Sequence, residues 1–284
     1  MCTAKKADSE EESEILAIEL RRERAVKETK LYEVETEGKL PIVYSSAYNI
    51  HFLGLEKLHP FDSKKWGHVI DRLIVNGKLT SGQIIEPREA TREDLRVVHT
   101  SCYLKMIQCP AELARIVEIA PVAFVPYCIL NRVLLKPMRF QTGGTILAAS
   151  IALERGFAIN IYPHDYEAKE AIKCAIRLES HTEDGDYLPK VRKGLATSLD
   201  SFSPDLIVYN AGTDCLEGDP LGRMDLSAKG VIRRDTLVFK AAAERKIPVL
   251  MVTSGGYTSR SAEVIADSIA NLLDVFILNE NKSD

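Results

Sequence analysis

Apolar positions in this chain fall into short continuous runs that alternate with segments of helical periodicity. The runs at residues 205–210 and 247–253 predict two buried parallel strands. Amphipathic segments at about 227–244 and 261–273 predict the helix that follows each strand. Strands that alternate with helices indicate an α/β fold with a mainly parallel sheet, and right-handed crossovers place helices on both of its faces.

The same patterns predict further elements before residue 200. Strands are expected at 40–44, 157–161 and 172–178. A helix is expected from Asp62 to the stop signal Gly77, and a shorter one after the cap Thr91. Two more are expected to begin at the segment 142–145 and at the cap Asp186.

Composition and charge indicate one folded domain, at 39–284, behind a charged N-terminal extension at 1–38 that reads as a solvated helix. The formal net charge of -4 offers no electrostatic footprint for nucleic acid. Six scattered cysteines predict neither a disulfide framework nor a cysteine zinc site. No apolar run reaches the roughly 18 residues of a membrane span, and the acidic N-terminus is unlike a targeting peptide. We therefore expect a soluble intracellular protein.

The candidate chemistry lies where the last two predicted strands end. Asp214 follows one of them and Tyr257 follows the other, which is where ligands bind in open α/β sheets. Asp214 could be a metal ligand, although an aspartate there could equally cap a helix or close a turn. Tyr257 follows two glycines and could direct its hydroxyl to an oxyanion, whereas the simpler reading is a surface tyrosine.

Other motifs carry weaker signals. The segment Thr142-Gly-Gly-Thr145 could bind an anion at a helix start, but close packing of a helix on a strand explains the glycines better. Ser254 lacks the G-x-S-x-G pattern of a serine nucleophile. The six histidines form no H-E-x-x-H, H-x-H or His-His arrangement, and His164 sits in a turn-like composition.

Together these segments resemble a known family. Tyr209-Asn-Ala-Gly-Thr-Asp214 and Val252-Thr-Ser-Gly-Gly-Tyr257 resemble motifs of the zinc-dependent histone deacetylases. Gly54-Leu-Glu-Lys-Leu-His-Pro-Phe-Asp62, with the segments at 97–100 and 141–145, resembles their class IV branch. The resemblance spans residues 40 to about 275 and implies an arginase/deacetylase-like α/β fold with a mainly parallel sheet.

The resemblance also implies zinc-dependent hydrolysis of acyl-lysine amides on histones or other proteins. By resemblance, Asp214 is the single surviving zinc ligand and Tyr257 the oxyanion stabiliser. The family's tandem His-His pair and its D-x-D-x-H-x-G-N-G strand have no counterpart in this sequence. The segment that ends at Asn160 resembles the family strand before the missing motifs. The segment that begins at Ile161 resembles one that lies well downstream in the family. The chain therefore reads as an internally deleted form, cut at about 160/161 and missing interior strands.

Such a form is expected to be inactive or severely impaired and not to retain zinc, because a catalytic zinc needs three protein ligands. The alternatives are a non-catalytic interaction or dominant-negative variant of the intact enzyme, and a sequence that lacks a segment present in the real protein. Expected partners are acyl-lysine proteins such as histones, with no direct contact to nucleic acid and no membrane span. The expected location is the nucleus, the cytoplasm or both.

Overall fold

The computed structural model describes residues 2–52, 54–58, 62–161 and 172–277. In these ranges the strands form one parallel sheet in the order β1-β2-β4-β3. The strands are β1 (Ile42–Val43), β2 (Phe157–Asn160), β3 (Ile207–Ala211) and β4 (Val249–Thr253). The α-helices are α1 (Cys2–Glu28), α2 (Lys65–Val75), α3 (Arg92–Leu95), α4 (Ser101–Met106), α5 (Pro110–Ile116), α6 (Tyr127–Leu130), α7 (Lys136–Arg155), α8 (Asp184–Ser201), α9 (Ala228–Glu244) and α10 (Ser261–Phe276).

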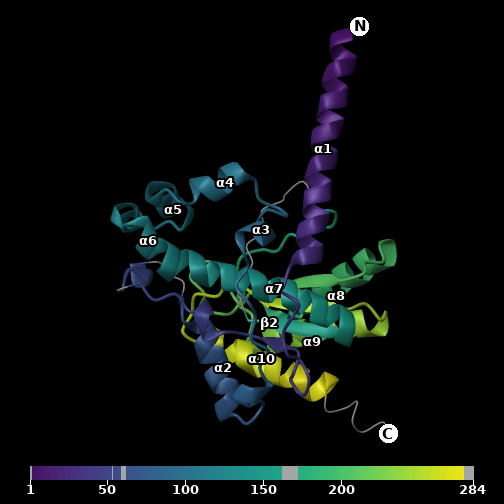
Figure 1. Ribbon diagram of the computed structural model, residues 1–284. Helices are drawn as coiled ribbons and strands as arrows, with labels where there is room; N and C mark the ends of the chain where they lie inside the picture. The colour runs from purple at the N-terminus through teal and green to yellow at the C-terminus, as the bar shows by residue number, and fades with distance from the viewer. Residues whose placement is uncertain (1, 53, 59–61, 162–171, 278–284) are drawn as a thin grey trace.

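Helices cover both faces of the sheet, as predicted (Figure 1). Neighbouring residues of β2 show why: Ala158 packs with α7 on one face, whereas Ile159 packs with α2 and α10 on the other. Along β4, Leu250 and Met251 divide in the same way. The two apolar layers fix the strands, and with them the loops that leave their carboxyl ends.

The predicted strands at 157–161 and 247–253 are confirmed, and the one at 40–44 is shortened to the two residues of β1. The strand predicted at 172–178 is wrong, because the described residues 172–178 contain no strand. Ile172 and Ile176 lie exposed there. A local apolar run becomes a strand only where a neighbouring strand and a core receive it.

Three predicted helix starts also need correction. The segment 142–145 lies within α7 rather than at its start, since α7 follows directly on the π-helical turn Asn131–Leu135. Helix α8 begins at Asp184 with Glu183 as its cap, so Asp186 lies in the first turn. Helix α2 begins at Lys65, three residues beyond Asp62. The helix start after Thr91 is confirmed, with the threonine side chain accepting from Asp94 N.

Close packing explains the two glycines of α7. A Cβ added to Gly144 would lie 1.7 Å from Tyr48 Oη, and one added to Gly143 would lie 2.1 Å from the Arg88 carbonyl oxygen. Both backbone amides lie inside a helix, where they are already engaged. The anion-site reading of this segment is therefore wrong.

Strand β3 differs from its prediction as a buried strand. Its first four residues alternate between half-buried and exposed, with Val208 58% exposed, and its last residue, Ala211, is buried. In the described residues β3 pairs with β4 alone. Helix α8, which packs on α9, has no fully buried residue. Among the described helices, none is both long and apolar enough to cross a membrane.

Candidate functional site

The two candidate residues lie at the carboxyl ends of neighbouring strands. Asp214 is three residues beyond β3 and Tyr257 four residues beyond β4, and these strands pair in parallel. Backbone bonds join the two loops, since Thr213 N and Thr213 Oγ1 both donate to the Gly255 carbonyl, at 3.0 and 3.1 Å. The structure therefore brings the two predicted segments together at one edge of the sheet.

The Asp214 carboxylate sits between two glycines. A Cβ added to Gly212 would lie 2.8 Å from Asp214 Oδ1, and one added to Gly255 would lie 2.8 Å from Oδ2. Asp214 is half-buried, and within the described part of the chain no hydrogen bond to its carboxylate is found. A cap or turn role for this side chain is thus not seen among the described residues.

The turn role belongs instead to Asp219. Its Oδ1 accepts from Leu221 N at 2.9 Å and from Gly222 N at 3.1 Å, which closes an aspartate turn. Its Oδ2 accepts from the backbone N–H of Tyr257 at 2.7 Å. One buried carboxylate therefore ties the loop that carries Asp214 to the loop that carries Tyr257.

The backbone before Tyr257 needs glycine. Gly256 has φ +125°, a conformation that residues with a side chain rarely adopt. A Cβ there would also lie 2.1 Å from Thr213 Oγ1. Tyr257 itself is half-buried. Its backbone is fixed by these contacts, while the part its hydroxyl plays stays a prediction.

Lys65 of α2 holds the same glycine loop, although the sequence analysis did not single it out. The side chain is 2% exposed, and its Nζ donates to the carbonyls of Ser254, Gly255 and Gly256 at 2.8, 3.2 and 3.2 Å. Burial lowers the pKa of Lys65 to about 7, and the charges of Asp214, Asp62 and Asp219 oppose that shift. The sequence does carry a signal that Lys65 is buried, because it precedes Val69 by four residues and so lies on the apolar face of α2.

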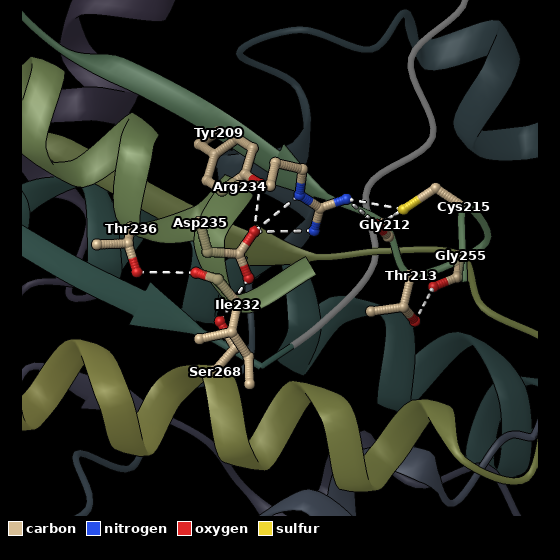
Figure 2. Close-up of polar contacts among 10 residues, drawn as sticks. All are labelled: Tyr209, Gly212, Thr213, Cys215, Ile232, Arg234, Asp235, Thr236, Gly255 and Ser268. Carbon is tan, nitrogen blue, oxygen red and sulfur yellow. Dashed lines mark hydrogen bonds and ion pairs between the residues drawn. The ribbon is translucent and has the colours of Figure 1, made fainter. Parts of the chain in front are cut away.

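A buried ionic cluster supports the Asp214 loop from α9 (Figure 2). Arg234 Nη1 donates to the Gly212 carbonyl at 2.6 Å and lies 3.2 Å from Cys215 Sγ. Arg234 Nε donates to Asp235 Oδ1 at 2.9 Å. Its Nη2 is also 2.9 Å from that oxygen but lacks hydrogen-bond geometry. The guanidinium thus fixes the backbone immediately before Asp214.

The rest of the cluster satisfies Asp235. Tyr209 Oη and Ser268 Oγ donate to the two carboxylate oxygens, so β3, α9 and α10 meet at one side chain. Burial and the Asp235 charge raise the pKa of Tyr209 well above its usual value, so the phenol stays a donor. Burial also raises the pKa of the Cys215 thiol, although Arg234 partly offsets it. These groups hold β3, α9 and α10 together and fix the loop that carries Asp214.

The donor set around Asp214 was tested against a zinc site. Among the described residues, no group of three or more His, Cys, Asp or Glu side chains could hold a metal ion. Asp219 is committed to three backbone amides. The described histidines lie elsewhere: His51 is exposed, His68 faces Asp62, His99 stacks on Tyr103, and His181 faces Asp225. His59 and His164 lie outside the described residues. The described residues therefore do not fit a catalytic zinc, which needs three protein ligands.

The comparisons with known proteins identify the relatives of this chain. Residues 156–273 match the model of the histone deacetylase domain. Histone deacetylase 2 of Arabidopsis thaliana is 39% identical over 323 residues, which cover 89% of this chain and 83% of that protein. Human histone deacetylase 1 is 31% identical over 104 residues, covering 36% of this chain and 21% of that protein.

Solved structures show the same fold. The HDA15 HD domain superposes with a TM-score of 0.53 at 17% identity, over 82% of this chain and 88% of that one. An HDAC homologue complexed with SAHA gives a TM-score of 0.58 at 14% identity, over 84% and 83%. The predicted arginase/deacetylase-like α/β fold is thereby confirmed. Given its extensive similarity to the Arabidopsis protein and the match at the very loops that carry Asp214 and Tyr257, the chain belongs to the histone deacetylase family.

Proposed function

We propose that this chain is an internally deleted, class IV-like histone deacetylase that neither retains zinc nor hydrolyses acyl-lysine amides. The observation that carries the proposal is the donor set: Asp214 stands at the strand end without two further metal ligands among the described residues. The class IV assignment rests on the motifs at 54–62, 97–100 and 141–145.

The length of the aligned relative supports the deletion. The match to the Arabidopsis protein runs over 323 residues, whereas 89% of this 284-residue chain is about 253 residues. About 70 residues of that relative therefore align opposite gaps in this chain. A cut between Asn160 and Ile161 would lie directly after β2.

The packing around β3 and α8 is consistent with missing interior strands. Val208 and Phe202 are 58% and 68% exposed, although both are large apolar side chains. Two polar atoms, Gln141 Oε1 on α7 and Thr253 Oγ1 on β4, are buried without a hydrogen-bond partner among the described residues. Buried polar atoms normally have partners. A removed segment would account both for the exposed apolar side chains and for the buried polar atoms without partners.

Loss of the metal would remove the activity for a chemical reason. A bound zinc would supply an activated water and a polarised amide carbonyl, and general acid and base groups typically add about 10²- to 10⁴-fold. The described loops of this chain keep Asp214 and the backbone that positions Tyr257. Neither group alone replaces the activated water and the polarised carbonyl that a bound metal would supply.

Substrate, partner and location follow from the family. Histones or other acyl-lysine proteins are the proposed ligands, and the nucleus or the cytoplasm is the proposed location. With the acyl-lysine site incomplete, any such binding would be non-catalytic and would use surfaces shared with the intact enzyme. A chain of this kind could compete with the intact enzyme for those partners.

The proposal is tested by metal content and turnover of the purified full chain. After incubation with zinc and dialysis, elemental analysis should find well under one zinc per chain, and an acetyl-lysine peptide should not be cleaved above the buffer rate. Asp214→Asn and Tyr257→Phe should leave both results unchanged. Zinc bound one to one, together with turnover that either variant abolishes, would refute the proposal.

A matched control restores the missing part. The aligned segment of the Arabidopsis relative, inserted between Asn160 and Ile161, should return both zinc binding and peptide cleavage. In that chimera Asp214→Asn should remove both. Failure of a folded chimera to bind zinc would show that the loss lies elsewhere in the chain.

A further inference from the structure

Helix α1 stands away from the rest of the molecule (Figure 1). It is 27 residues long, or about 40 Å at 1.5 Å per residue. Near its C-terminal end Arg21 Nη2 donates to the Arg96 carbonyl at 3.1 Å. Ile18, Arg21 and Ala25 are half-buried on the same side, and the other side chains from Ile15 to Glu28 are exposed.

The outer side of α1 carries two leucines. Leu16 and Leu20 are each two residues from Ile18, so they lie about 200° round the helix from it. Both are 57% exposed, and Ile15 and Val26 beside them are 51% and 49% exposed. Helices owe most of their stability in water to packing of an apolar face rather than to propensity. The outer face of α1 therefore lacks the packing that a long helix ordinarily has.

Charge along the same helix is divided between its halves. The sequence at 8–14 has five acidic residues and no basic one, whereas 21–27 has four basic residues and one acidic one. Two such helices placed side by side in parallel would bring like charges together. Placed antiparallel, each acidic segment would lie beside a basic segment of the other copy.

We propose that α1 pairs with α1 of a second copy of this chain as an antiparallel two-helix coiled coil. The twofold axis passes near Ile18, so that Leu16 of one copy packs against Leu20 of the other. A twofold interface must be self-complementary, and a helix that carries both charges at opposite ends of one apolar patch meets that requirement. The partner of α1 is thus a second copy of this chain, since α1 itself carries both the acidic segment and the basic segment that would pair.

The first test is the oligomeric state of the full chain by sedimentation equilibrium. The chain should form a concentration-dependent dimer, and the affinity should fall with added salt because salt screens the attraction between oppositely charged segments. Leu16→Ala with Leu20→Ala should raise the dissociation constant at least about tenfold while keeping helix propensity. Val75→Ala with Phe124→Ala is the matched control, since these residues are 83% and 90% exposed elsewhere and should leave the constant unchanged.

The second test exchanges the charges. One variant carries E10K/E11K/E12K/E14K and the other R22E/R24E/K27E, which leaves the Arg21 contact in place. Each variant alone should be monomeric, because its two copies repel, and an equimolar mixture should form a one-to-one dimer. Circular dichroism on each variant checks that the helix is retained.

The third test fixes the orientation. An L16C chain mixed with an L20C chain should give a disulfide-linked heterodimer under mild oxidation, in excess of either homodimer. The inference fails if the full chain stays monomeric at about 100 µM, because the dissociation constant would then be weaker than that of typical specific complexes. It also fails if the dimer is insensitive to the α1 variants, or if L16C links mainly to itself. None of these readouts depends on zinc or catalysis, so they stand apart from the proposed function.

Discussion

Lys65 shows how one buried cation can organise a loop without taking part in chemistry. An ammonium group in a low-dielectric interior is stable only when hydrogen bonds replace its water. The carbonyls of Ser254, Gly255 and Gly256 provide those bonds. In return the lysine fixes three consecutive peptide groups immediately before Tyr257. The glycines make this possible, since side chains at 255 and 256 would collide with Asp214 and Thr213.

The lowered pKa of Lys65 predicts a pH dependence of stability. Its folded value of about 7 lies below the 10.5 of a free lysine, so between these values the unfolded state binds more protons. The free energy of unfolding should therefore rise with pH across that window, by up to about 1.4 kcal/mol per unit from this group. Below pH 7 the lysine is protonated in both states, and its full desolvation cost is present.

Urea unfolding of the wild type and of Lys65→Met from pH 7.5 to 9.5 measures this effect. The difference between the two proteins should shift in favour of the wild type as pH rises, because methionine has no proton to lose. Parallel curves for the two proteins would contradict the low pKa of Lys65.

At the scale of elements, Asp235 links α9 to β3 and α10, and its ion pair is with Arg234, its neighbour on α9. Both side chains are almost fully buried, and Asp235 also accepts from Tyr209 of β3 and Ser268 of α10. Removing one partner of a buried pair leaves an uncompensated charge, which costs about 3–5 kcal/mol, whereas removing both is far less harmful.

A double-mutant cycle tests that coupling. Asp235→Asn and Arg234→Met should each lower the free energy of unfolding substantially, and the double variant should lose less than the sum, with a coupling of about 1–3 kcal/mol. Chemical denaturation measures all four proteins. An additive cycle would mean that Arg234 is held by the Gly212 carbonyl and not by Asp235.

The elements that sequence reasoning predicted well are those whose apolar pattern is strong and whose apolar residues are buried in the core. Strand β4 and helices α9 and α10 are of this kind, and Ser227 caps α9 as its side chain accepts from Gly230 N. The strand predicted at 172–178 and the buried character predicted for β3 depended on neighbouring strands, which local sequence does not encode. The motifs located Asp214 and Tyr257, whereas Lys65 and Arg234 act through contacts more than 20 residues away in sequence.

At the scale of the whole molecule, the exposed side of β3 is where the deletion proposal and the fold meet. Strand β3 pairs with β4 among the described residues and alternates between half-buried and exposed until its last residue, whereas β4 is buried along its full length. If interior strands are missing, the outer side of β3 belongs to an edge. Apolar side chains there contribute little to stability, because folding does not remove them from water.

Two valines, one on β3 and one on β4, test whether this side of β3 is exposed or covered in solution. Val208→Ser on β3 should change the free energy of unfolding by less than about 0.5 kcal/mol. Val249→Ser on β4, where the valine is 2% exposed, should cost about 2 kcal/mol or more, since it loses buried methyl groups and buries a hydroxyl. Urea unfolding of both variants against the wild type measures the contrast. Equal losses at the two sites would mean that Val208 is covered in solution, and the reading of this face of β3 as exposed would be wrong.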